Sequence, residues 1–166
     1  ISIFAYVFRS KNPGPVALFM GGMHGDEING LEIVRRSITD GMFTNLKCGS
    51  VICIPLLNIF GFINFSRDVP DGKDVNRSFP GSMTGSLASR VARLITKKIL
   101  SLVDFGIDFH TGGRDHWNEP QLRFSPKSPE SYDLARQCEF PLLVEKAVVS
   151  KSLRKIAKDL KKPILV

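Results

Sequence analysis

The chain has 166 residues, of which 23 are Lys or Arg and 16 are Asp or Glu, so its formal net charge is +7. Apolar residues make up 43%, an ordinary globular composition that excludes a disordered tail, a collagen-like fibre and a coiled coil. No stretch approaches the ~18 uncharged apolar residues of a transmembrane helix. Cys48, Cys53 and Cys138 lack the close spacing of a thiolate metal site. We therefore expect reduced thiols, a cytoplasmic protein and no membrane partner.

Apolar runs and turn residues predict strands that alternate with helices. We expect strands at 2–8, 16–20, 51–57, 105–110, 121–124 and from 163 onward. Helices are expected at 26–38, with Gly41 as its stop, and at 87–102, 130–138 and 151–161. The polar segment 58–85 predicts a loop too long for an ordinary connector. This order predicts an α/β fold in one domain, with a mostly parallel or mixed central sheet covered by helices on both faces.

The basic charge is densest between Lys146 and Lys162. Leu153, Ile156 and Leu160 recur there at helical spacing between the lysines, which is typical of a solvated helix face. A polyanion-binding module is the alternative, and it predicts binding that weakens steeply with salt. Trp117 lies outside this run, so no stacking platform accompanies the charge. We expect no nucleic-acid partner.

His24 and Glu27 stand three residues apart where the first helix begins. Residues at this spacing are neighbours on a helical turn, and two His with one Glu is a common ligand set of catalytic zinc. Acidic residues also favour helix N-termini. As an alternative, Glu27 could therefore only stabilise the start of the helix, without any role in metal binding.

A third candidate ligand, His110, ends the strand that contains Asp108. A carboxylate commonly orients a metal-bound imidazole, and Asp108 is a candidate for that role toward His110 or His24. Alternatively, His110 is a core histidine that closes a strand. His116 lies in a polar segment and is expected at the surface or at a pocket rim.

The long loop contains Arg67, Asp74, Asn76 and Arg77. Arginine binds a carboxylate through a bidentate fork and can stabilise the oxyanion that forms when water adds to an amide. These residues could equally form a structural Arg–Asp network that holds the loop.

Three motifs in this order, HGDE (24–27), DVNRSFPG (74–81) and DFHTGG (108–113), resemble the succinylglutamate desuccinylase/aspartoacylase family of zinc carboxypeptidase-like deacylases. The resemblance runs from Pro13 to Arg114 and continues more loosely through 152–166. It implies a carboxypeptidase-like α/β hydrolase with one zinc ion per chain.

The resemblance also implies roles for individual residues. His24, Glu27 and His110 fall on the metal ligands. Arg67 falls near the arginine that polarises the scissile carbonyl, and Asn76 with Arg77 matches the pair that binds the substrate carboxylate. The reaction implied is hydrolysis of the amide bond of an N-acyl amino acid or similar small carboxylate substrate by metal-activated water.

The family's general-base Glu has no counterpart in its usual context within this sequence. The glutamates that follow the DFHTGG motif, none in the matching context, are Glu119, Glu130, Glu139 and Glu145. We therefore expect that the base lies beyond Val166, that residues 1–166 form an incomplete catalytic domain, and that a small C-terminal β domain follows. A carboxypeptidase-type metallopeptidase and a family member that keeps zinc only for structure remain alternatives, and the oligomeric state stays open.

Overall fold

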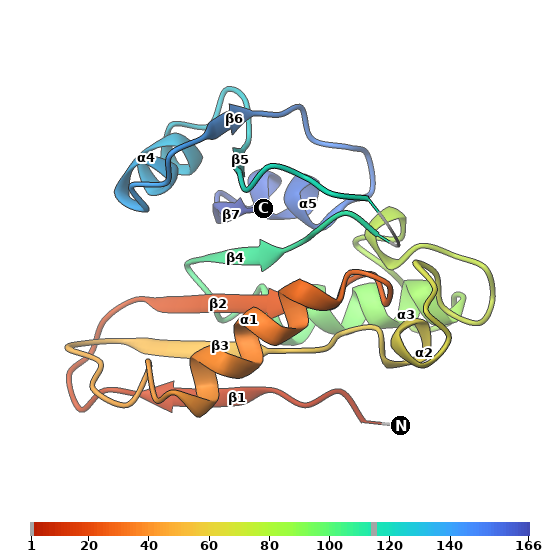
Figure 1. Cartoon of the computed structure of the whole chain (residues 1–166), viewed down its shortest axis with the longest axis horizontal. Coiled ribbons are helices and arrows are strands. Elements are labelled where there is room, and N and C mark those ends of the chain that lie inside the picture. Colours follow the sequence, from red (N-terminus) through yellow and green to blue (C-terminus); the bar gives the residue numbers. More distant parts are fainter. Residues whose placement is uncertain (1, 114–115) are drawn as a thin grey trace.

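The computed structural model describes residues 2–113 and 116–166, which form a five-stranded sheet flanked by helices (Figure 1). The strands of this sheet, in spatial order, are β1 (Tyr6–Arg9), β3 (Ser50–Ile54), β2 (Val16–Gly21), β4 (Phe105–Phe109) and β7 (Ile164–Leu165). β1 pairs antiparallel with β3, and the other three pairings are parallel. The predicted α/β fold with a mostly parallel sheet is confirmed.

Four helices overlap their predicted segments, namely α1 (Ile28–Thr39), α3 (Leu87–Leu94), α4 (Pro129–Gln137) and α5 (Leu153–Asp159). A fifth helix, α2 (Ile59–Ile63), was not predicted. α3 continues into a π-helical turn, Ile95–Ile99, which the periodicity did not indicate. Gly41 has a φ of +71° and follows the end of α1, as expected of a helix stop.

Two segments differ from prediction. The polar segment expected to be a loop contains α2 and a 3₁₀ turn, Val75–Arg77. Residues Leu143–Glu145 form a strand, β6, that was not predicted and that pairs in parallel with β5 (Leu122–Phe124) in a separate small sheet. Its three residues are too short a run to show a period of two, so only the pairing with β5 reveals it.

The two faces of the sheet carry alternating side chains, as the pleat requires. Leu18 and Met20 of β2 pack with the α3 side of the molecule, where Ala88, Ala92 and Ile95 are buried. Ala17 and Phe19 of the same strand face α1, where Val34 is buried. Figure 1 shows α1 and α3 on these opposite faces. Both faces are therefore covered, which explains the nearly continuous apolar runs of β2 and β3.

Three parallel strands end at one edge of the sheet, because Gly21 of β2 is in register with Phe109 of β4 and its carbonyl accepts from Leu57 after β3. α1 packs closely here, since a Cβ on Gly30 would lie 2.3 Å from the carbonyl oxygen of Phe109. Ligand sites of open α/β sheets form at such carboxyl ends. No helix in the described part of the chain has the length and apolar character to cross a bilayer.

Candidate metal centre and substrate cavity

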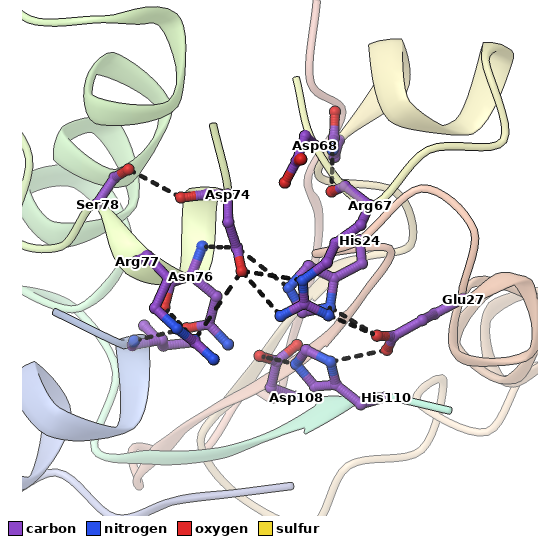
Figure 2. A network of polar contacts seen from close by, with 12 residues as sticks. His24, Glu27, Arg67, Asp68, Asp74, Asn76, Arg77, Ser78, Asp108 and His110 are labelled. Atoms are coloured by element: carbon purple, nitrogen blue, oxygen red, sulfur yellow. Dashed lines mark hydrogen bonds and ion pairs between the residues drawn. The ribbon is translucent and has the colours of Figure 1, made fainter. Parts of the chain in front are cut away.

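The three predicted ligands meet at this edge of the sheet (Figure 2). His24 follows β2, Glu27 precedes α1 and His110 follows β4. Nδ1 of His24 lies 2.7 Å from Oε1 of Glu27, and Nδ1 of His110 lies 2.8 Å from Oε2. One N or O atom from each residue falls within 4.8 Å of the others, and all three side chains are at most partly exposed. This geometry can hold one metal ion.

Glu27 occupies the N-cap position of α1 but makes no capping bond with its side chain. Its oxygens instead meet the two imidazoles, and Oε2 also accepts from the backbone N–H of Thr111 at 3.0 Å. The N-terminus of α1 therefore lacks a side-chain cap, because the carboxylate of Glu27 points to His24 and His110 instead. The alternative in which this Glu serves only as a cap does not describe the structure.

Each imidazole has a carboxylate on its outer nitrogen. Nε2 of His110 lies 2.8 Å from Oδ2 of Asp108, so Asp108 serves His110 rather than His24. Nε2 of His24 lies 3.2 Å from Oδ1 of Asp74, a partner that sequence reasoning placed only in the long loop. The Asp–x–Asn–Arg spacing gave no signal for this contact. Carboxylates in these positions fix the tautomer in which Nδ1 is free to coordinate.

The donor set fits a cation. When Nε2–H donates to Asp74 or Asp108, each Nδ1 presents a lone pair to an oxygen of Glu27. Two acceptors at 2.7–2.8 Å repel each other unless they share a proton or a metal ion. Two imidazoles and one carboxylate are ligands that zinc accepts.

The pKa shifts of these groups favour a proton between the paired acceptors. Burial opposes charge on His110, but the carboxylates of Asp108 and Glu27 outweigh it and raise the pKa of His110 to about 10. Burial likewise opposes charge on Glu27, yet the two imidazoles hold its pKa well below the usual range. The pKa of His24 is raised by Asp74 and Glu27 against the effect of burial. Metal binding at neutral pH would therefore release protons.

Arg67 lies beside the ligands. Its Nε and Nη2 donate to Oδ2 of Asp74 at 3.0 and 2.8 Å, and Nη1 is 3.2 Å from Nδ1 of His24. Nη1 is also 3.5 Å from Oε1 of Glu27. The predicted Arg–Asp network thus exists, and it holds one end of the guanidinium next to the metal ligands. A structural and a chemical role for Arg67 are compatible.

Close backbone packing places Arg67 near His24. A Cβ on Gly25 would lie 1.9 Å from the carbonyl carbon of Gly61 in α2, so only glycine fits there. Asn58 caps α2 by accepting from the N–H of Gly61 at 2.8 Å, and its amide donates to the carbonyl of Arg67 at 3.2 Å. The His24 loop and the start of the long loop are therefore fixed against each other.

Asn76 and Arg77 lie in the 3₁₀ turn that follows Asp74. Oδ1 of Asn76 accepts from the backbone N–H of Leu153 at 2.9 Å, so the first turn of α5 orients its amide. Nη1 of Arg77 donates to the carbonyl of Asn76 at 2.8 Å, and this side chain is about half exposed, at 47%. Both residues line the same cavity as the metal ligands.

This cavity measures about 420 Å³, a size suited to a small molecule. Its charged lining includes the acids Glu27 and Asp108, both engaged by histidines, and five basic residues. The basic residues are Arg67, Arg77, Arg123, Lys146 and Arg154. The cavity is therefore suited to an anion. Arg67 and Arg77 were predicted as site residues from the sequence, whereas the other three were not.

The remaining candidates lie at or outside the rim. His116 lines the cavity, and its Nδ1 is 3.0 Å from the carbonyl of Gly113, as expected of a rim residue. Glu119, Glu130, Glu139 and Glu145 are all exposed, and none is among the described residues that line the cavity. Arg114, where the resemblance ends, lies outside the described residues.

The chain is similar to proteins of known class. It is 34% identical over 105 residues to N-alpha-acetyl-L-2,4-diaminobutyric acid deacetylase of Halomonas elongata, a match over 63% of this chain and 30% of that protein. An aspartoacylase family protein from Mesorhizobium loti superposes with a TM-score of 0.87 at 26% identity, over 99% of this chain and 55% of the other.

A succinylglutamate desuccinylase/aspartoacylase from Rhodobacter sphaeroides superposes with a TM-score of 0.83 at 25% identity, over 99% of this chain and 50% of the other. The chain thus spans about half the length, or less, of these relatives. Residues 13–160 match the family described as Succinylglutamate desuccinylase/Aspartoacylase catalytic domain. This match covers most of the sequence and includes all three motifs, and the chain therefore belongs to the succinylglutamate desuccinylase/aspartoacylase family.

Proposed function

We propose that this chain is the main part of the catalytic domain of a zinc-dependent amidohydrolase that cleaves the amide bond of an N-acyl amino acid. The observation that carries the proposal is the meeting of His24, Glu27 and His110 within 4.8 Å at the edge of an anion-suited cavity. The family and the deacetylase of Halomonas elongata support the reaction class.

A bound zinc ion would supply Lewis acidity at the scissile carbonyl and acidify water. His24, Glu27 and His110 would hold it, with Asp74 and Asp108 fixing the imidazoles. Asn76 and Arg77 would bind the substrate carboxylate. That contact sets the distance between the carboxylate and the reacting amide, so it selects amino acid derivatives over simple amides.

Arg67 would stabilise negative charge that develops on the carbonyl oxygen. Its Nη1 faces the metal ligands while Asp74 holds Nε and Nη2, so the guanidinium is aimed before substrate binds. A preorganised donor of this kind needs no rearrangement during the reaction.

The general base is proposed to lie beyond Val166 in the complete protein. Two observations support this position. Val166, which directly follows β7, lines the cavity, and the four glutamates considered from the sequence do not. Residues 1–166 would then need the following segment for full activity.

The test measures metal and activity in the full-length protein. Elemental analysis is expected to find about one zinc per chain, lost in His24→Ala and in His110→Ala. The zinc-loaded protein should release an amino acid from N-acetyl or N-succinyl amino acids, and a chelator should abolish this. His116→Ala, altered at the rim, is the matched control and should keep its zinc.

Two results would contradict the proposal. Absence of bound metal after zinc is supplied would exclude the hydrolase. Cleavage of peptides in preference to N-acyl amino acids would favour the carboxypeptidase-type alternative instead.

A further inference from the structure

A second cavity, of about 480 Å³, adjoins the substrate cavity, and the mechanism above does not use it. Thr111, Gly112 and His116 line both cavities, so they form a common wall. Asp26 and Ile28 also line the second cavity, and they directly precede and follow the glutamate ligand in the sequence. The second cavity therefore begins beside the metal ligands.

This cavity lies away from the residues proposed to bind the substrate carboxylate. Figure 2 shows Glu27 and the Asn76–Arg77 pair on opposite sides of the two histidine ligands. Asn76 and Arg77 line only the first cavity, whereas the neighbours of Glu27 line the second. The carboxylate and the acyl group of an N-acyl amino acid are attached to opposite ends of its amide bond. With the carboxylate at Asn76 and Arg77 and the amide at the metal centre, the acyl group extends toward the second cavity.

Two large apolar side chains form part of the second cavity. Ile28 is the first residue of α1, and Phe65 directly follows the C-cap of α2. They are 45% and 67% exposed, so their apolar surface faces the cavity rather than the core. Among the described residues, the lining contains no Lys or Arg and has Asp26 as its carboxylate. The cavity is therefore suited to an uncharged apolar group and unfavourable for an anion.

Phe65 has an unusual backbone conformation. Its φ is +47°, in the left-handed region that favours glycine. The N–H of Ser66 donates to the carbonyl of Gly61 at 2.8 Å, and the N–H of Phe65 donates to that of Phe62 at 3.3 Å. These two bonds end α2 in a Schellman motif, in which glycine is the usual residue at the position of Phe65. Burial does not offset the strain, because the ring is mostly exposed, and unrelieved strain of this kind is typical of ligand-binding positions.

The turn that carries Phe65 is attached to the metal-binding loop. The carbonyl of Ser66 accepts from the N–H of Gly25 at 3.0 Å, and Gly25 directly follows His24. The ring of Phe65 is therefore held in a defined place beside the metal ligands before substrate binds. A preorganised apolar surface binds its ligand with a smaller loss of entropy.

We propose that the second cavity binds the acyl group of the substrate, with Ile28 and Phe65 in contact with its carbon chain. This inference rests on the proposed function and narrows it to N-acyl amino acids whose acyl group is uncharged and longer than acetyl. Asp26 disfavours a carboxylate at the far end of the chain. The preferred acyl group is therefore a straight apolar chain such as butanoyl.

The experiment compares kcat/KM of the full-length, zinc-loaded protein on N-acetyl-, N-butanoyl- and N-succinylalanine. Butanoyl adds two methylene groups to acetyl, and succinyl has a carboxylate in place of the terminal methyl of butanoyl. N-butanoylalanine should exceed N-acetylalanine by about tenfold, the effect of burying two methylene groups. It should exceed N-succinylalanine by about tenfold or more, because a carboxylate is costly to bury without a cation. Equal values for the acetyl and butanoyl substrates, or a preference for succinyl, would overturn the proposal.

Variants of Phe65 test its part in this preference. Phe65→Ala should lower the ratio of kcat/KM for butanoyl over acetyl toward one, and Phe65→Leu should keep part of it. Phe4→Ala is the matched control, because Phe4 is also 67% exposed and lines neither cavity. Phe65→Gly should lower the ratio as Phe65→Ala does and keep the thermal unfolding midpoint, since glycine adopts this φ readily. A ratio that survives removal of the ring would overturn the proposal.

Calorimetry separates this inference from the proposed function. If the protein hydrolyses none of the substrates, the deacylase proposal fails, but binding of N-butanoylalanine and N-acetylalanine can still be compared. Tighter binding of the butanoyl compound that is lost in Phe65→Gly supports the acyl site. Equal binding of the two compounds overturns it.

Discussion

The carboxylate of Asp74 lies 3.2 Å from Nε2 of His24, although 50 residues separate them. The same carboxylate receives Nε and Nη2 of Arg67, so one residue orients a metal ligand and the neighbouring guanidinium together.

Asp74→Asn should weaken zinc binding by about 10–100-fold, because an amide can face His24 Nε2 with its NH₂ group and no longer fixes the tautomer. A chelator competition assay measures the affinity. Asp133→Asn, at an exposed position of α4, makes the same chemical change and should leave the affinity unaltered. If both variants bind zinc equally well, Asp74 does not support His24.

Gly25→Ala should lower both stability and zinc affinity. Its methyl group would meet Gly61 at 1.9 Å, and overpacking of this kind costs about 1–3 kcal/mol in the free energy of unfolding. Gly72→Ala is the comparison, since nothing lies within 4 Å and only its positive φ is strained, by about 1–2 kcal/mol.

Urea unfolding and chelator competition on the two glycine variants distinguish these causes. Both are expected to be destabilised, but only Gly25→Ala should lose zinc affinity, because Gly25 packs against α2 beside His24 and Gly72 has no neighbour within 4 Å. Normal zinc binding by Gly25→Ala would show that this close packing does not position the site.

Ser152→Ala and Ser86→Ala remove equivalent helix caps. The two hydroxyl groups accept from Lys155 and Ser89, so each substitution should cost about 1 kcal/mol of stability. Only Ser152 precedes Leu153, whose N–H orients the amide of Asn76. Ser152→Ala should therefore also raise KM for N-acyl amino acids, whereas Ser86→Ala should not. Equal KM values in the two variants would show that the α5 cap does not position Asn76.

The three cysteines should differ in reactivity. Cys53 is buried, and burial raises its pKa to about 12, while Cys48 and Cys138 are exposed. At pH 8 the thiolate fraction of Cys53 is about 1 in 10⁴. A thiol-reactive chromophore should label two groups in the native protein and a third only after unfolding.

The raised pKa of Cys53 also predicts that the free energy of unfolding falls at alkaline pH. Because folding favours the protonated thiol of Cys53, its contribution to stability is complete below the ordinary thiol pKa of about 8.5 and is lost as pH rises toward 12. Alkaline unfolding should be milder in Cys53→Ala once the packing loss, measured at pH 7, is subtracted. If the free energy of unfolding depends on pH in the same way in the wild type and in Cys53→Ala, the pKa of Cys53 is not raised.

Elements with strong local patterns could be predicted from the sequence. The apolar runs of β2 and β3 and the stripes of α1 and α3 are visible because both faces of the sheet are buried and the helices are amphipathic. His24 and Glu27 are close in sequence, so their shared turn was predictable. His110 was predicted as the third ligand because its motif resembles that of the family. The rule that parallel strands end at one edge of a sheet placed it near the other two.

Contacts between residues far apart in the chain could not be predicted, because they depend on how the elements pack. Asp108 could have served either imidazole, and the register of β2 with β4 assigned it to His110. Asp74 lies 3.2 Å from His24 only in the folded long loop, where Arg67 donates to the same carboxylate. The places of Arg123 and Lys146 in the cavity lining depend on the pairing of β5 with β6, a strand too short to show a period. Local patterns report which face of an element is buried, whereas long-range pairing alone determines which polar side chains share a cavity.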